Sequence, residues 1–317
     1  MTIEDISKQF HVSISTVSKA LNGSTDIAEK TRKAICEYAN SVGYRSRRSK
    51  AIKGRLAVLL GAASDDARSL PEIASAFCRE AEAENYLLTQ RTIDSGFILN
   101  SFLAERQYTG VFALGVDVNS AAERELKASG YPVVFLGTPI ADAPQISGVK
   151  SDHLVAVSKA VDHLVSLGHS LIAFIGSEDL TGAERFAGYF FGLSKNAIPY
   201  RYDLTRFDGL TEQAGRNAAD YFLSYDKYFT AAVCASRASA LGFIDVVRRA
   251  GKRVPEDISV ICFGDSPEEP SMTAIAQDFD ELGKRAFEVL KATLQGFPAQ
   301  HCAVPCSLVN TGATCTV

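Results

Sequence analysis

The feature that most constrains the fold of this chain is its head, the segment 2–24 with the sequence TIEDISKQFHVSISTVSKALNGS. Thr2 is a suitable N-cap, and Asp5 three residues later completes a capping box. Ser13 can cap a second helix after a tight turn. Two helices this short are not stable alone, so a third must cover them. Residues 27–42 supply it, with an apolar side made of Ala34, Ile35, Tyr38, Ala39 and Val42. This layout is a helix-turn-helix, whose second helix offers side chains to a DNA groove.

The charge distribution points the same way independently. Residues 1–55 hold eleven Lys and Arg against five Asp and Glu, a formal charge of +6, whereas the remaining residues hold 22 against 32, a formal −10. A basic head on an acidic body suits phosphate binding, because the cations contact the DNA backbone while the body is repelled by it. The charge alone is also compatible with an alternative in which the basic side chains form a solvated surface on a small helical domain. Together with the capped helix pair, it favours DNA binding.

The composition is that of a globular protein with two or three domains: 317 residues, 46% hydrophobic and 22% charged. No apolar run approaches the roughly 20 residues of a membrane span. The polar N-terminus lacks the apolar core of a signal peptide, so we expect a cytoplasmic protein with no membrane partner. Seven cysteines without framework spacing fit reduced thiols. His301-Cys302 with Cys306 resembles metal ligands but lacks a second pair, so neither a metal nor another cofactor is predicted.

From residue 56 onwards, short apolar segments alternate with helical ones. LAVLL at 56–60 and YPVVFLG at 131–137 are continuous apolar runs, typical of strands buried on both faces of a parallel sheet. The alternation restarts at residue 152. Two such series predict an α/β fold with two similar lobes of doubly wound parallel sheet, and a ligand crevice outside the carboxyl ends of the strands. Periodicity alone leaves the last helix and the segments near 303–311 open to either lobe.

Several ordered blocks along nearly the whole chain carry a resemblance to a known family. They are the head, HLVSLGHSLIAFIG, ERFAGYFFGL, ALGF followed by VPEDISV, and DFDELGKRA near the end. The chain resembles the lactose-repressor/purine-repressor (LacI/GalR-type) family of bacterial transcription regulators. The resemblance implies a two-lobed periplasmic-binding-protein-like core behind the head, a homodimer on a palindromic operator, and a small-molecule effector in the cleft that changes the orientation of the lobes. The implied domains are 1–44 for the helix-turn-helix, 45–55 for the linker, 56–151 with 279–306 for the N-lobe, and 152–278 with 307–317 for the C-lobe.

The resemblance also implies which residues contact DNA. Ile14, Ser15 and Lys19 take the positions that face base edges, and Lys19 stands where Arg is common. Lysine can donate to guanine O6 and N7 but lacks the rigid fork of arginine, so we expect softer discrimination at that base pair. Contacts to phosphate, which position the protein without reading sequence, are expected from Thr2, Ser13, Thr16, Ser18 and Asn22. For the Ser and Thr residues the alternative is capping or solvent exposure, and for Ser13 capping is favoured.

The linker departs from the family pattern. Tyr44-Arg45 is followed by Ser46-Arg47, and the linker is several residues shorter than usual. In the family this stretch folds on DNA into a hinge helix and inserts a leucine into the minor groove. Here Ile52 is the only apolar candidate for that wedge. The alternative is that Ile52 packs at the lobe boundary. Tyr44, Arg47 and Ile52 complete the expected DNA contacts.

The cleft departs from the family pattern even more informatively. Arg185, in ERFAGY, matches the family's effector-binding arginine, with an ion pair to Glu184 or another acid as the alternative. Ser236-Arg237 replaces the usual Asn-Asp pair. Gly264 stands where an effector-binding Asp is usual, and Asp265 follows one residue later. Carboxylates accept hydrogen bonds from sugar hydroxyls, so their loss argues against recognition of a neutral polyol.

Arg68, Arg185 and Arg237 could converge on one crevice with few compensating acids. Crowded guanidinium groups repel each other unless an anion joins them. The hypothesis is therefore an anionic effector: a sugar acid, a phosphorylated sugar or a small carboxylate. The alternative is that Arg68 and Arg237 point outward, to solvent or to acids on the dimer surface. The expected effector contacts are Ser64, Arg68, Thr181, Arg185, Leu210, Ser236, Arg237, Asp265 and Phe279.

Other functions fit the sequence less well. An enzyme is not predicted, because no nucleophile–base arrangement, phosphate loop or metal constellation is present. A solute-binding protein of a transporter would share the lobes but would not carry residues 1–55. Tetramers of the family use a C-terminal coiled coil, and this sequence shows no heptad tail after Ser307, so the resemblance implies a dimer. A regulator of the same architecture with a degenerate cleft, controlled by a protein corepressor or by no small molecule, remains the alternative.

Overall fold

The chain forms two units in the computed structural model, which describes residues 2–21, 26–42, 52–61, 69–93, 99–116, 120–137, 146–225, 228–264 and 272–317. The first unit consists of Met1–Gly54 with Glu84–Leu87. The second unit consists of Arg55–Ala83 with Leu88–Val317. Among the described residues, no helix is long and apolar enough to cross a bilayer.

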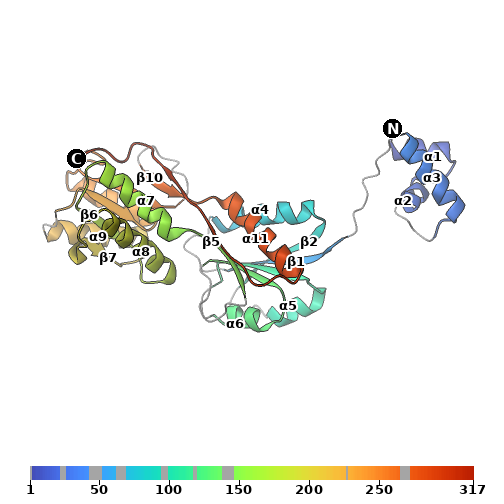
Figure 1. The fold of residues 1–317 in the computed structure, drawn as a ribbon, viewed down its shortest axis with the longest axis horizontal. Helices are drawn as coiled ribbons and strands as arrows, with labels where there is room; N and C mark the ends of the chain where they lie inside the picture. The colour runs from blue at the N-terminus through green and yellow to red at the C-terminus, as the bar shows by residue number, and fades with distance from the viewer. Residues whose placement is uncertain are drawn as a thin grey trace. The chain divides into compact units, whose positions relative to one another are not determined.

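Three helices form the head within the first unit: α1 (Ile3–Gln9), α2 (Ile14–Leu21) and α3 (Glu29–Ser41) (Figure 1). The predicted helix-turn-helix with a covering third helix is confirmed. Neither α1 nor α2 exceeds eight residues, so their stability comes from a shared core rather than from helix propensity. That core consists of Ile6, Val17, Ala20, Ile35 and Ala39. The expectation that Ala34 belongs to the covered side is wrong, because this residue is exposed.

Two six-stranded sheets lie in the second unit, except for Gly54 of the first sheet's opening strand and residues 86–87 of its edge strand, which belong to the first unit. The first sheet has the strand order β11-β5-β4-β3-β1-β2. Its strands are β1 (Gly54–Gly61), β2 (Tyr86–Ile93), β3 (Gly110–Leu114), β4 (Val133–Leu136), β5 (Ser147–Ser151) and β11 (His301–Val304). The second sheet has the order β12-β10-β9-β8-β6-β7. Its strands are β6 (Ile172–Ile175), β7 (Thr205–Arg206), β8 (Ala231–Cys234), β9 (Ser259–Phe263), β10 (Thr273–Ala276) and β12 (Ser307–Val309).

The two sheets repeat one topology. In each, the chain starts on an inner strand, adds an edge strand on one side, and then adds its remaining strands on the other side. The registers of β1 with β3 and of β6 with β8 are parallel, and β10 pairs antiparallel with β12. The order therefore reverses beside β1 and beside β6, which places ligand crevices outside the carboxyl ends of these strands. The predicted α/β fold with two doubly wound sheets is confirmed.

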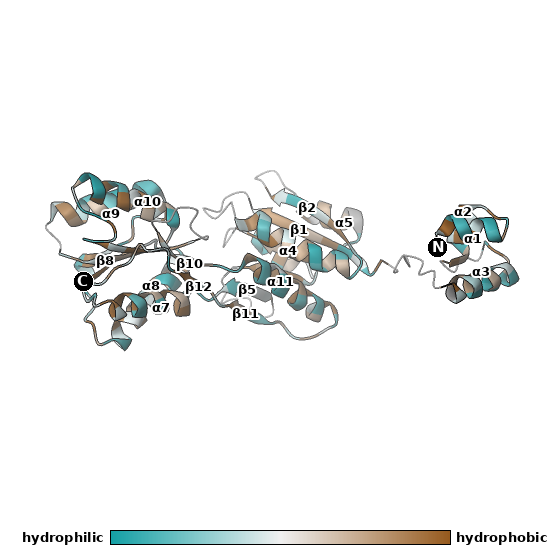
Figure 2. Cartoon of the chain, turned by 90° about the horizontal axis from the view of Figure 1, so that it is seen from above, coloured by the Kyte–Doolittle hydropathy of each residue, from teal (hydrophilic) through white to brown (hydrophobic). Residues whose placement is uncertain are grey.

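Helices cover both faces of each sheet. On the first sheet, α4 (Ser69–Ala83) packs against α11 (Phe279–Leu294), while α5 (Leu99–Arg106) and α6 (Ala121–Ala128) lie on the other face (Figure 1). On the second sheet, α7 (His153–Ser166) pairs with α8 (Leu180–Lys195), and α9 (Glu212–Ser224) pairs with α10 (Arg237–Arg249). A short 3-10 helix, η1 (Tyr202–Leu204), precedes β7. Figure 2 shows β1 in the brown of apolar residues, whereas α9 and α10 carry teal, hydrophilic residues.

Three crossing segments connect the sheets: β5 leads into α7, β10 into α11, and β11 into β12. Hydrogen bonds tie these segments together. The Ser151 hydroxyl donates to Gln277 Oε1 at 2.7 Å, and the Asp152 amide donates to the Val304 carbonyl at 2.8 Å. The segments that link the two sheets are thus bonded to one another.

Candidate DNA-binding face and effector cavity

The start of each of the first two head helices is fixed by a side-chain cap. Thr2 Oγ1 accepts from the Asp5 amide at 3.3 Å, and Asp5 Oδ2 accepts from the Thr2 amide at 2.8 Å. The bond from the Thr2 amide is the main cause that lowers the pKa of the Asp5 carboxyl. Ser13 Oγ accepts from the Thr16 amide at 3.0 Å and lies 2.8 Å from the Thr16 hydroxyl. Thr2, Ser13 and Thr16 therefore hold structural bonds, whatever contacts they make to DNA.

The outer side of α2 is exposed. Val17 and Ala20 are buried, whereas Ser13, Ile14, Ser15 and Lys19 are exposed and Thr16 and Ser18 half-buried. Ile14 keeps 46% of its surface accessible, a large value for an isoleucine on a helix with a packed side. The Lys19 ammonium lies 3.2 Å from Asp26 Oδ2, and both side chains are more than half exposed. An ion pair this exposed contributes little stability, so phosphate or base groups can replace the carboxylate.

Of the remaining expected DNA contacts, Ile52 is among the described residues. Ile52 belongs to the first unit and is 61% exposed. Asn22, Tyr44 and Arg47 lie outside the described residues.

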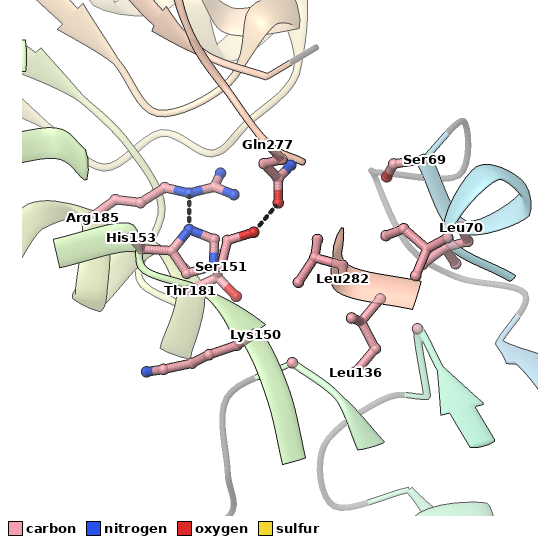
Figure 3. Close-up of a pocket in the computed structure, with 13 residues that line it drawn as sticks. Ser69, Leu70, Leu136, Lys150, Ser151, His153, Thr181, Arg185, Gln277 and Leu282 are labelled. Atoms are coloured by element: carbon pink, nitrogen blue, oxygen red, sulfur yellow. Dashed lines mark hydrogen bonds between the residues drawn. The ribbon is translucent and has the colours of Figure 1, made fainter. Parts of the chain in front are cut away.

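A cavity of about 170 Å³ opens in the second unit where elements of both sheets meet. Figure 3 shows polar residues on one side of the cavity: Lys150 and Ser151 of β5, His153 of α7, Thr181 and Arg185 of α8, and Gln277 after β10. Ser69, Leu70, Leu136 and Leu282 lie on the other side. Its described lining is Ser69, Leu70, Ile73, Gly115, Leu136, Gly137, Lys150, Ser151, His153, Thr181, Arg185, Gln277 and Leu282.

Arg185 is the most buried charged residue of this wall, with 3% of its surface exposed. Its Nη1 donates to the Ala235 carbonyl at 2.5 Å, and its Cζ lies 3.9 Å from the centre of the Phe263 ring. Its Nε donates to His153 Nδ1 at 3.4 Å. The carbonyl that follows β8, the aromatic ring at the end of β9 and the histidine of α7 thus hold the guanidinium in one orientation.

Two acids near Arg185, Glu184 and Asp179, hold bonds to other groups. Glu184 Oε1 pairs with Lys150 Nζ at 2.5 Å, so an ion pair between neighbours Glu184 and Arg185 is not what the structure shows. Asp179 caps α8: Oδ2 accepts from the Ser177 hydroxyl at 2.6 Å and Oδ1 from the Gly182 amide at 2.8 Å. Burial alone would raise the pKa of Asp179, but these hydrogen bonds, with the nearby Arg185 charge, lower it.

His153 is neutral in this environment. Burial is the main cause that lowers its pKa to about 3, and the charges of Arg185 and Lys150 add to it. The positive charges of this wall therefore belong to Arg185 and to Lys150, which is paired with Glu184. The histidine adds no charge.

Comparison with known proteins places this architecture in a family. The model of the bacterial regulatory proteins, lacI family, matches residues 2–46, and the periplasmic binding protein-like domain matches residues 161–315. The probable HTH-type transcriptional repressor ExuR of Bacillus subtilis is 30% identical over 274 residues, which cover 84% of this chain and 82% of that protein.

The chain belongs to the LacI family of bacterial regulatory proteins. The HTH-type transcriptional regulator MalR of Streptomyces coelicolor is 29% identical over 94% of this chain and 92% of its own length. Among solved structures, the lac repressor dimer bound to operator and an anti-inducer covers 99% of both chains with a TM-score of 0.72 and 24% identity. A CelR–cellobiose complex covers 98% of both chains with a TM-score of 0.71 and 24% identity. This LacI-family protein is a ligand-responsive, DNA-binding transcription regulator and not an enzyme.

The cavity includes only part of the set that the family resemblance implied. Thr181 and Arg185 line it. Leu210, Ser236, Arg237 and Phe279 are described but are not among its lining residues, and Ser64, Arg68 and Asp265 lie outside the described residues. The Ser236 hydroxyl donates to the Leu210 carbonyl and caps α10 by accepting from the Ser239 amide. Arg237 is half-buried, and its Nε is sealed from solvent without a hydrogen-bond partner in the described part of the chain.

Sequence reasoning missed the polar residues that the crossing segments bring to the cavity: Lys150, Ser151, His153 and Gln277. Asp152, the N-cap of α7, was a usable signal, because the residue after a cap begins the helix at the carboxyl edge of the preceding strand. His153 occupies that position.

Proposed function

We propose that this LacI-family regulator is a cytoplasmic repressor of carbohydrate metabolism that binds a palindromic operator as a homodimer and is controlled by an anionic small molecule. The effector is a sugar acid, a sugar phosphate or a small carboxylate, and it occupies the cavity lined by elements of both sheets. In this proposal residues 1–44 read DNA and 45–55 form the hinge. The effector lobes are 56–151 with 279–306, and 152–278 with 307–317.

The charge of the cavity wall is the observation that carries the effector proposal. The charged residues of the described lining, Lys150 and Arg185, are both cations, and no Asp or Glu belongs to that lining. Lys150 pairs with Glu184, and Arg185 donates to the Ala235 carbonyl and to His153. A carboxylate or phosphate of an effector at this wall can accept charge-assisted hydrogen bonds from a guanidinium.

The size of the cavity favours a small molecule over control by a partner protein alone. A protein cavity of about 150 Å³ holds a six-membered ring such as benzene. The volume here, about 170 Å³, is of that order. A regulator with a degenerate cleft would have no need to keep a cavity of this size beside a buried arginine.

The exposed side of α2 supports the DNA half of the proposal. Ile14, Ser15 and Lys19 share this side, which suits an apolar contact with a thymine methyl and a lysine donor to guanine. The lac repressor structure is described as a dimer bound to operator. Two copies related by a two-fold axis present two such helices, which predicts half-sites of inverted sequence.

A thermal-shift screen of the full chain tests the effector class. The acids are D-glucuronate, D-gluconate, D-glucose 6-phosphate and citrate, and the neutral sugars are D-glucose, maltose and cellobiose. An acid at about 100 times its Kd should raise Tm by roughly 5–10 °C. Arg185→Met should abolish that shift. Arg201→Met, at an exposed residue that pairs with Asp203, is the matched control and should retain it.

Stabilisation by the neutral sugars and by none of the acids would contradict the anionic effector. No stabilisation by any compound, with operator binding intact, would favour the degenerate-cleft regulator. Operator reading is tested separately by selecting bound sequences from random DNA and measuring the mass of the free protein. Palindromic sites and a dimeric mass are expected, whereas single half-sites bound by a monomer would refute the dimer.

A further inference from the structure

His153 is a cavity residue whose hydrogen bonding is decided by its neighbours. It is the first residue of α7, is 7% exposed, and its ring centre lies 5.0 Å from that of Phe263. Its Nδ1 receives the Nε–H of Arg185 at 3.4 Å. A guanidinium can only donate hydrogen bonds, so Nδ1 must be the unprotonated nitrogen of the ring.

The surroundings also exclude the doubly protonated ring. Burial lowers the pKa of His153 most, and the positive charges of Arg185 and Lys150 lower it further. The N-terminus of α7 adds the positive end of a helix dipole. The adjacent Asp152 carboxylate caps this helix by accepting from the Val155 amide at 3.2 Å. A neutral ring with a bare Nδ1 carries its proton on Nε2.

The Nε2–H of His153 has no hydrogen-bond partner among the described residues. It is not among the buried polar atoms that lack a partner in the described part of the chain. Nε2 is therefore accessible, and His153 is one of the residues that line the cavity. Figure 3 shows the ring between Arg185 and Ser151 on the polar side of the cavity.

We propose that His153 is a specificity-determining residue of the effector site, in which Nδ1 orients Arg185 and the Nε2–H donates to an anionic oxygen of the effector. The inference rests on the anionic effector proposed above and adds the group that recognises it. A carboxylate or phosphate oxygen accepts from such a donor without presenting a hydrogen that would need an acceptor in turn. A ligand group that can only donate hydrogen bonds would meet the His153 Nε2–H and the Arg185 guanidinium, which are both donors. Such a ligand should therefore bind more weakly.

Three substitutions separate the two roles of the ring. His153→Asn places an amide oxygen near the position of Nδ1, so it can still accept from Arg185, but it ends before Nε2. His153→Gln reaches the position of Nε2 with an amide nitrogen. His153→Phe keeps a ring against Phe263 and removes both nitrogens. His163→Asn, on the same helix but bonded to Thr314 rather than facing the cavity, is the matched control.

Calorimetric titration of the full chain with D-glucuronate, D-glucose 6-phosphate, citrate and D-glucose measures the effect. Loss of a hydrogen bond to a charged group predicts about ten- to hundred-fold weaker binding of the acid by His153→Asn and His153→Phe. His153→Gln should retain more affinity than either, and His163→Asn should match the natural chain. Operator affinity without effector should be unchanged in the control, His163→Asn.

A second measurement needs no effector. Two-bond ¹H–¹⁵N correlation spectra of the histidine rings should show His153 with its proton on Nε2 at pH 7. A proton on Nδ1, or a doubly protonated ring, would overturn the inference. So would unchanged acid binding in His153→Asn and His153→Phe. If no acid binds the natural chain, the anionic effector itself fails, and the ligand contact of His153 fails with it.

Discussion

The neutral state of His153 should make the stability of the second unit depend on pH below the ordinary histidine range. The pKa of His153 is lowered from 6.5 to about 3, with burial as the main cause. Between these two pH values His153 binds a proton in the unfolded chain but not in the folded chain. The free energy of unfolding therefore decreases as the pH falls below 6.5. At pH 5 the difference amounts to 1.5 pH units, or about 2 kcal/mol at 1.36 kcal/mol per unit.

The measurement is urea unfolding followed by far-ultraviolet circular dichroism at pH 7.5 and pH 5.0. His163 and His169 also have lowered pKa values, caused mainly by burial, so the natural chain should lose more than the His153 share. His153→Asn keeps both of these histidines, and its loss between the two pH values should be smaller by about 2 kcal/mol. Equal losses in the two proteins would refute the assignment of a neutral, buried His153.

Three further predictions follow from single contacts. Thr2→Ala removes the cap that bonds the Asp5 amide and should lower the stability of the head by about 1 kcal/mol, measured by thermal unfolding; an unchanged melting curve would contradict the cap's importance. Lys19→Ala should relax sequence selection at one base pair of each half-site with little change in the salt dependence of DNA affinity; a uniform loss with a shallower salt slope would instead identify a phosphate contact. Gly283→Ala would place a Cβ 2.5 Å from the Ile73 carbonyl oxygen and force α11 away from α4. It should destabilise the chain by about 1–3 kcal/mol and weaken effector binding, because Ile73 lines the cavity; normal stability with normal binding would show that the two helices need not approach so closely.

The sequence predicts those parts of the fold whose signal is local. The apolar run at 56–60 lies within β1, and 131–137 contains β4. It does not predict β5 or β10, the strands that precede the first two crossings. β5 reads Ser-Gly-Val-Lys-Ser, in which Val149 is the only large apolar residue. Its place depends on pairing with β11, about 150 residues later, and on the bond of the Ser147 hydroxyl to Thr293. Such long-range partners leave no periodicity in the segment itself.

In the candidate site, too, the residues that the sequence predicts lie in local motifs, and the residues that it misses depend on long-range contacts. Arg185 is predictable because it lies inside a contiguous motif on one helix, and Thr181 comes with it from the same helix. Ser236 was expected at the cavity, yet a serine directly before a helix is first of all a cap, and its hydroxyl is bonded in that role. His153, Ser151 and Gln277 reach the cavity only because separate crossing segments meet there. One of these contacts, between Arg185 and His153, joins residues that are 32 positions apart in the sequence. Because burial lowers the pKa of His153, the histidine accepts this hydrogen bond in its neutral form, and Arg185 carries the charge.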